Sequence, residues 1–238
     1  MVKRGKHYQQ ALEKLDPAKL YSPEEAIELA KELSWTHFDE TVTVDLRTNA
    51  DARHADQLVR GIVILPNGTG RPVRVVVFAE GEAIDIARKA GADEVGGDDL
   101  VKKIEDGWLD FEVAIANPPM MGRIGRLGRI MGRRGLMPNP RTGTVVAPED
   151  LPRTIREAKQ GRVEYRTDRT GIIHVPIGKV SFSTEQLLEN LTILVDAVNR
   201  ARPSAIKGRF LHTAYLSTTM GPGIQMDIHA STALKAVI

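Results

Sequence analysis

The stretch Val73-Arg74-Val75-Val76-Val77-Phe78-Ala79 decides the fold of the central part of this chain, because it is an almost continuous apolar run. Two helical patterns follow it, at about 82–90 and 98–105, and a second short apolar run stands at 113–116. Strands that are apolar on both faces and alternate with helices are typical of a parallel sheet covered on both sides. We therefore predict an α/β structure for this region.

The segment before this region has a different texture, in which polar and apolar residues alternate. Ser22 is followed by Pro23 and, three residues after the serine, by Glu25, which predicts a capped helix start. Residues 41–46 then alternate between polar and apolar, as expected of a half-buried strand with a polar outer face.

The segment after the central region returns to the alternating texture. Residues 162–167 and 171–177 have the pattern of a β-hairpin. A long amphipathic helix begins at Ser183 and ends before Pro203, and two strands are expected at about 208–219 and 223–228. Neither flank alone supplies enough strands for a stable domain, so the two flanks should form one sheet together.

The predicted fold class is therefore α/β and α+β, in two domains. Residues 1–67 and 161–238 form a discontinuous α+β domain of both termini. Residues 68–160 form an inserted three-layer α/β (Rossmann-like) domain. The whole chain has the composition of an ordinary globular protein, with 42% apolar and 27% charged residues.

The composition excludes several classes of protein. The 238 residues contain no cysteine, so disulfides and thiolate sites are excluded and a reducing, cytoplasmic location is expected. The basic N-terminus is not followed by an apolar signal-peptide core, and no apolar run reaches the ~20 residues of a membrane span.

Positive charge is concentrated in one segment of a nearly neutral chain. Between Glu112 and Glu149 there is no acidic residue, whereas six arginines and six glycines occur there. Such clusters usually persist near a polyanion, most often nucleic acid, although a solvated basic loop is the simpler alternative. The arginines expected to make secondary contacts with RNA are Arg123, Arg126, Arg129, Arg133 and Arg134.

Signatures of catalysis are scarce. The chain has no phosphate-binding loop ending in Gly-Lys-Ser/Thr, and no Gly-x-Gly-x-x-Gly follows the run at 73–79. Its six histidines show no spacing typical of metal ligands. We therefore predict no catalytic residue, no metal and no cofactor.

Hydroxyl-bearing and apolar side chains recur on the predicted strands and turns. Each of these positions alone is most simply explained as ordinary strand or turn surface. Together they form the kind of flat surface that contacts RNA, because hydroxyls bond the 2′-OH and apolar groups support riboses and bases. The candidate RNA-binding residues are Phe38, Glu40, Thr41, Thr43, Arg166, Asp168, Arg169, Lys179, Ser181, Thr218, Thr219, Met220 and Gly221.

Several motifs resemble those of the bacterial ribosomal protein L-one family, in order and spacing. The most specific are Thr218-Thr219-Met220-Gly221-Pro222 and the glycine–arginine–proline segment from Met121 to Pro140. Phe38-Asp39-Glu40-Thr41 and Asp168-Arg169-Thr170-Gly171 match as well. The resemblance extends from Lys6 to about Ile228. Two departures are His37, where relatives often have Lys or Arg, and a tail from Ala230 to Ile238 with no obvious counterpart.

This resemblance implies a function. Family members form the mobile stalk of the large ribosomal subunit, where they bind ribosomal RNA and assist release of deacylated tRNA from the exit site. In many bacteria they also repress translation of their own mRNA. The resemblance thus implies a structural RNA-binding protein, monomeric off the ribosome, with ribosomal RNA, exit-site tRNA and its own operon mRNA as partners. The alternative is an RNA-modifying or nucleotide-using enzyme built on the inserted domain, which the missing signatures argue against.

Overall fold

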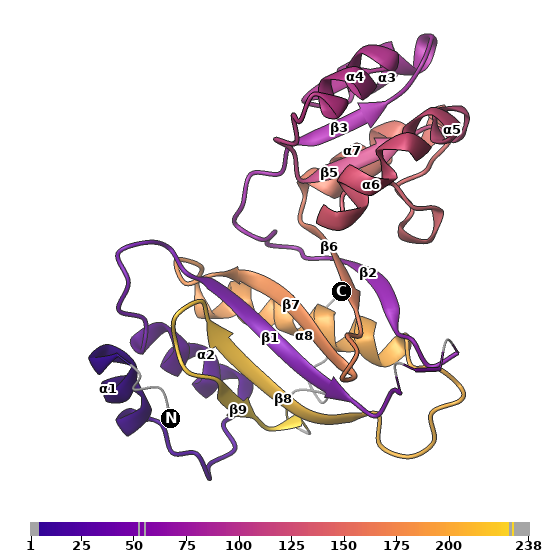
Figure 1. The fold of residues 1–238 in the computed structure, drawn as a ribbon. Helices are drawn as coiled ribbons and strands as arrows, with labels where there is room; N and C mark the ends of the chain where they lie inside the picture. Colours follow the sequence, from indigo (N-terminus) through magenta and orange to yellow (C-terminus); the bar gives the residue numbers. More distant parts are fainter. Residues whose placement is uncertain (1–4, 52, 55, 229, 231–238) are drawn as a thin grey trace. The chain divides into compact units, whose positions relative to one another are not determined.

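The computed structural model describes residues 5–51, 53, 54, 56–228 and 230 (Figure 1). Its chain divides into two compact units. One, here called the split unit, comprises the described residues up to Gly70 together with those from Val163 onward. The other, the inserted unit, runs from Arg71 to Arg162. Each unit has its own hydrophobic core, and each is described separately.

The split unit is built around a four-stranded antiparallel sheet in the order β7-β1-β8-β9. These strands are β1 (Thr41–Thr48), β7 (Ile172–Lys179), β8 (Leu211–Thr218) and β9 (Ile224–Met226). β1 comes from the N-terminal flank and its three partners come from the C-terminal flank. The two flanks therefore share one sheet.

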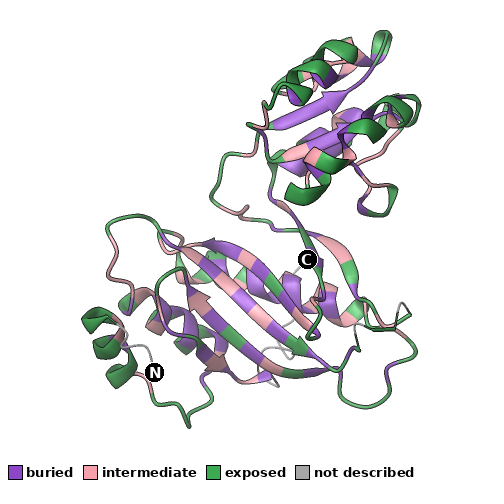
Figure 2. Cartoon of the chain, in the orientation of Figure 1, coloured by how far each residue is buried: buried purple, intermediate pink, exposed green. Residues whose placement is uncertain are grey.

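Among the described residues of the split unit, helices cover one face of this sheet and not the other (Figures 1 and 2). Val42, Val44 and Leu46 point to that face and pack in one core with side chains of α2 (Pro23–Glu32) and α8 (Thr184–Arg200). A shorter helix, α1 (Lys6–Lys14), adds Ala11 to this core. The opposite face carries the polar residues of β1 and stays open within the split unit.

The two predicted helix starts are confirmed. The Ser22 and Ser183 hydroxyls accept hydrogen bonds from the backbone N–H groups of Glu25 and Gln186, at 3.2 and 3.1 Å. The side chains of Glu25 and Gln186 accept in return from the serine N–H groups, which completes a capping box at each helix.

The predicted hairpin of residues 162–167 with 171–177 is wrong. β6 (Arg162–Arg166) pairs with β2 (Arg60–Ile64) in a separate two-stranded sheet, and only one bridge, Thr167 to Ile173, joins the expected partners. The Tyr165 ring is buried and its hydroxyl donates to the Ala197 carbonyl at 3.2 Å. A Cβ at Gly61 would lie 2.4 Å from that hydroxyl, so glycine makes room for the ring in β2.

The inserted unit has the predicted three-layer fold class. Its parallel sheet has the order β4-β3-β5, made of β3 (Val75–Phe78), β4 (Glu94–Gly96) and β5 (Val113–Ala116). Side chains of α3 (Glu82–Lys89) and α7 (Leu151–Lys159) share one core with Val75 and Val77. α4 (Asp98–Glu105) packs on the other face with Val76 and Phe78.

The basic glycine-rich segment, predicted as a loop, is helical. It consists of five short turns: η1 (Pro118–Met120), α5 (Met121–Ile124), η2 (Gly125–Leu127), α6 (Gly128–Met131) and η3 (Gly132–Arg134). Ile124, Leu127 and Met131 are buried against the core of the inserted unit. Together with Met120, these buried residues recur at helical spacing, which the glycine content concealed, whereas Ile130 of the three-residue repeat is only half-buried. Two further turns, η4 (Pro140–Thr142) and η5 (Pro148–Asp150), lead to α7.

Among the described residues, no helix has the combination of length and apolar character that crossing a membrane requires.

Candidate nucleic-acid interface

The open face of the four-stranded sheet brings together outward-facing residues of three strands. In β1 these are Thr41, Thr43, Asp45 and Arg47, at every second position. The strand register places Lys179, Pro176 and His174 of β7 on one side of them. On the other side it places Ser217, Tyr215 and Thr213 of β8. The result is a flat, mainly polar surface of the composition that suits RNA.

One end of this face, here called the Met220 end, gathers most of the predicted residues. Lys179 Nζ donates to Thr41 Oγ1 at 2.9 Å, and the Thr41 N–H donates to Thr219 Oγ1 at 3.0 Å. The Asp39 carboxylate accepts from the backbone N–H and the hydroxyl of Ser181, at 3.1 and 2.8 Å. The start of β1 is thus tied to the ends of both neighbouring strands.

A buried carboxylate organises this end. The Glu40 side chain is fully buried and accepts from Ser34 Oγ at 2.9 Å and from Thr36 Oγ1 at 2.8 Å. It also accepts from the Met220 N–H at 2.9 Å. Burial opposes its charge, but the hydrogen bonds from Met220, Thr218, Thr36 and Ser34 outweigh it and lower the pKa of Glu40.

The burial of Glu40 corrects its predicted role. A fully buried side chain has no surface to offer to RNA, so Glu40 is a positioning residue and not a contact residue. The same correction applies to Thr218, which is buried and whose Oγ1 accepts from the Gly221 N–H at 3.1 Å. A Cβ at Gly221 would lie 2.4 Å from that oxygen, so the tight turn after β8 requires glycine.

Two large apolar side chains flank the buried carboxylate and point outward. Phe38 is 55% exposed and Met220 is 50% exposed. Thr36 links the Phe38 segment to Glu40, because its Oγ1 lies within 3.0 Å of both the Phe38 carbonyl oxygen and the Glu40 carboxylate. The protein thus holds two exposed apolar groups in a fixed place, which favours contact with bases or riboses.

The middle of the open face is mostly internally paired. Asp45 Oδ1 lies 2.6 Å from His174 Nδ1, and Thr43 Oγ1 lies 3.0 Å from Ser217 Oγ. Tyr215, directly opposite Asp45 in the register, is 36% exposed and adds an aromatic ring to the surface.

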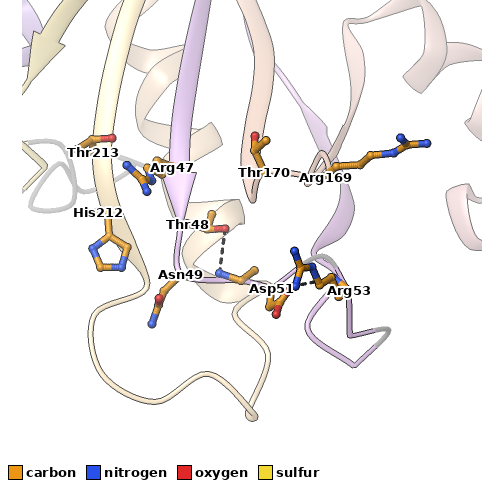
Figure 3. A pocket seen from close by; sticks show the side chains of 10 residues that line it. Arg47, Thr48, Asn49, Asp51, Arg53, Arg169, Thr170, His212 and Thr213 are labelled. Atoms are coloured by element: carbon orange, nitrogen blue, oxygen red, sulfur yellow. Dashed lines mark hydrogen bonds between the residues drawn. The ribbon is translucent and has the colours of Figure 1, made fainter.

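The far end, here called the Arg47 end, holds the remaining predicted residues of the split unit. Arg169 lies at the turn between β6 and β7 and lines a pocket of about 620 Å³ with Arg47 and Arg53 (Figure 3). Arg166 and Asp168 lie in the chain beside this turn. The structure therefore separates Arg166, Asp168 and Arg169 from the Met220 end, because β7 runs antiparallel to β1.

The Asp168 carboxylate shapes the turn itself. Its Oδ1 accepts from the backbone N–H groups of Thr170 and Ile172, each at 2.8 Å. Partial burial raises the pKa of Asp168. The hydrogen bonds outweigh this effect and lower the pKa to about 2, since the Thr170 hydroxyl and His174 bond to the carboxylate as well. The side chain is therefore used within the protein before any ligand binds.

The basic segment of the inserted unit divides into paired and unpaired arginines. Arg123 forms ion pairs with Glu80 and with Asp98, the latter at 3.2 Å, and Arg126 lies 4.0 Å from Glu105. Arg129, Arg133 and Arg134 form no ion pair within the part of the chain that the structure describes. The charge available to an external polyanion is therefore on the last three.

Sequence reasoning missed several residues of the open face. Arg47, Tyr215, Ser217 and His212 lie on or beside it but were not predicted. Their signal was present, because Arg47 continues the outward alternation of Thr41, Thr43 and Asp45.

Because the chain has no cysteine, a metal ion would need acidic and histidine side chains as its ligands. In residues 5–228, apart from the undescribed positions 52 and 55, no group of three or more is placed to hold a metal ion.

Comparisons with known proteins relate this chain to ribosomal proteins. The model of the "Ribosomal protein L1p/L10e family" matches residues 30–222. The chain is 58% identical to large ribosomal subunit protein uL1 of Thermomicrobium roseum over 237 residues, which cover 99% of this chain and 98% of that protein. It is 52% identical to uL1 of Dehalococcoides mccartyi strain CBDB1, with 100% of both chains covered. The uL1 of Chloroflexus aurantiacus strain J-10-fl is 56% identical over 99% of this chain.

The full coverage corrects one expectation from the sequence. The tail from Ala230 to Ile238 was expected to have no counterpart, but it lies inside the alignment with Dehalococcoides mccartyi uL1. Apart from Ala230, the tail lies outside the described residues.

Proposed function

This chain belongs to the ribosomal protein L1p/L10e family, and we propose that its split unit binds large-subunit ribosomal RNA through the open face of the four-stranded sheet. Membership of a family of structural ribosomal proteins sets aside the alternative of an RNA-modifying or nucleotide-using enzyme. The place of action is the large ribosomal subunit, which in bacteria is in the cytoplasm.

The observation that carries the proposal is the construction of the Met220 end. Phe38 and Met220 remain half exposed although they are apolar, and the buried Glu40 fixes the segments that present them. The exposed hydroxyls of Thr219 and Ser181 lie at the same end of the sheet. Hydrogen bonds to the Thr41 N–H and to the Asp39 carboxylate hold them there. RNA-binding surfaces combine apolar groups that contact bases with hydroxyls that bond to riboses, and the Met220 end has both.

Finer parts of the proposal rest on family membership alone. We propose that the protein assists release of deacylated tRNA at the exit site, represses translation of its own mRNA, and is monomeric off the ribosome. Arg129, Arg133 and Arg134 of the inserted unit would supply the secondary contacts to ribosomal RNA or tRNA, with smaller parts for the ion-paired Arg123 and Arg126.

The proposal is tested with the double variant Phe38→Ala/Met220→Ala of the full chain. The dissociation constant for a stem-and-loop fragment of large-subunit ribosomal RNA should rise at least about thirtyfold. Two exposed contacts at roughly 1–3 kcal/mol each support a loss of that size. The fold should persist, since both side chains point into solvent.

A matched control is Leu20→Ala, which removes a side chain that is also 55% exposed but lies outside the open face. Its affinity for the RNA should equal that of the wild type. An unchanged dissociation constant for the double variant, with an intact fold, would remove the Met220 end from the binding site.

A further inference from the structure

The Arg47 end of the sheet has an arginine-lined pocket, which RNA contacts at the Met220 end do not account for. Three arginines come to one pocket from separate parts of the split unit: Arg47 from the end of β1, Arg53 from the loop after it, and Arg169 from the turn before β7. His212, at the start of β8, lines the same pocket. The pocket therefore exists only because the sheet brings both flanks of the chain together.

The charge of this pocket is not balanced by the protein. Arg47, Arg53 and Arg169 form no ion pair with any described residue. Of the residues that line the pocket, Asp51 alone is acidic, and its Oδ1 accepts from the Arg53 backbone N–H at 2.9 Å. The three positive charges around this polar pocket repel one another. Binding of a polyanion would relieve this repulsion and is therefore favoured.

The arrangement of the side chains indicates what kind of anion fits. Figure 3 shows Arg47 and His212 at one side of the pocket, with Arg53 and Arg169 at the other, and the Arg169 side chain extending outward. The guanidinium groups do not converge on one point, and the pocket that these residues line has a volume of about 620 Å³. Successive phosphates of a nucleic-acid backbone match this spread better than a single phosphate ion.

We propose that the pocket at the Arg47 end binds the sugar–phosphate backbone of the same RNA whose bases and riboses contact the Met220 end. This inference rests on the proposed function. The two ends lie at opposite ends of the eight-residue strand β1, about 23 Å apart at ~3.3 Å per residue. One RNA would therefore lie along β1, across Thr43 and the exposed ring of Tyr215. Phosphate contacts at one end fix the position and orientation of the RNA, and contacts at the other end supply selectivity.

The test uses the double variant Arg47→Gln/Arg169→Gln of the full chain and the ribosomal RNA fragment of the previous section. Binding is measured over a range of salt concentrations. Loss of two phosphate contacts should reduce the slope of log K against log salt by about 1.4, at ~0.7 per phosphate of single-stranded RNA. Affinity at low salt should fall at least tenfold, and millimolar inorganic phosphate should not displace the RNA from the wild type.

The matched control is Arg88→Gln/Lys89→Gln, which removes the same charge from the last turn of α3 in the inserted unit. It should leave the slope unchanged. An unchanged slope for Arg47→Gln/Arg169→Gln, with the wild type binding normally, overturns the inference and leaves the proposed function intact. Displacement of the RNA by inorganic phosphate overturns it as well. A wild type that does not prefer this RNA to an unrelated one overturns the proposed function itself, and the inference with it.

Discussion

Glu40 shows how one residue shapes a surface that it does not reach. Its carboxylate accepts from the Ser34 and Thr36 hydroxyls and from the Met220 N–H, and Thr36 Oγ1 also donates to the Phe38 carbonyl oxygen. Its position could have been predicted, because Glu40 shares the inward alternation of Val42, Val44 and Leu46. What sequence alone does not reveal is its set of donors, since Met220 is 180 residues away.

Replacing Glu40 with Gln should weaken both folding and RNA binding. The amide group of Gln adds a donor where only donors surround it, so one buried polar group loses its partner at a cost of about 1–3 kcal/mol. Denaturant unfolding measures this loss, and a titration with RNA measures the affinity. Glu28→Gln, on the exposed side of α2, is the control and should change neither quantity. Wild-type stability for Glu40→Gln would show that the carboxylate is not needed.

Asp168 gives the protein a predictable sensitivity to acid. Because the native pKa of Asp168 is lowered to about 2, its contribution to stability is complete above the ordinary value of about 3.9. That contribution is lost as the pH falls through the native pKa. The wild type should therefore be more stable than Asp168→Asn at pH 7, and this difference should shrink between about pH 4 and pH 2. Free energies of unfolding across that range test it, and a difference that stays constant would contradict it.

At the scale of elements, local signals identified helices and strands better than their pairing. The capping residues Ser22 and Ser183 and the apolar run at 73–79 predicted α2, α8 and the parallel sheet. The turn at Asp168–Gly171 was also identified, but a turn does not reveal how far the strands on each side stay paired. β6 pairs with β2 instead of β7, and the buried Tyr165 of β6 bonds to the Ala197 carbonyl of α8, a contact that the local sequence pattern does not show.

The helical basic segment carries a prediction about its glycines. An added Cβ at Gly128 meets nothing within 4 Å, and the backbone there is right-handed helical. Gly128→Ala should therefore stabilise the inserted unit by roughly 0.5–1 kcal/mol through helix propensity. Trp108 lies in this unit and Trp35 in the split unit, so unfolding followed by Trp108 fluorescence in a Trp35→Phe background isolates the effect.

Gly135 supplies the matched control for that prediction. Its surroundings are equally open, but its φ is +72°, a conformation that other residues rarely adopt. Gly135→Ala should destabilise the inserted unit where Gly128→Ala stabilises it. If both variants lower the stability, residue 128 does not have the helical conformation described here.

At the scale of the whole molecule, the chain consists of two compact units with separate cores. That each is an independently folding domain, with boundaries near those predicted from the sequence, remains a prediction. We propose that primary RNA recognition lies in the split unit and that arginines of the inserted unit make secondary contacts. Arg123 and Arg126 of the basic segment are ion-paired within the inserted unit, whereas the sheet shared by both flanks presents exposed apolar and hydroxyl groups together.

The most direct test of this central claim compares the two units with the whole chain. Residues 1–70 joined to 163–238 by a short linker, and residues 71–162 alone, are each titrated with the ribosomal RNA fragment. We expect the split unit to bind within tenfold of the whole chain, a difference of at most about 1.4 kcal/mol, and to prefer this RNA to an unrelated one. The inserted unit should show no such preference. Selective binding by the inserted unit, with none by a folded split unit, would contradict the account.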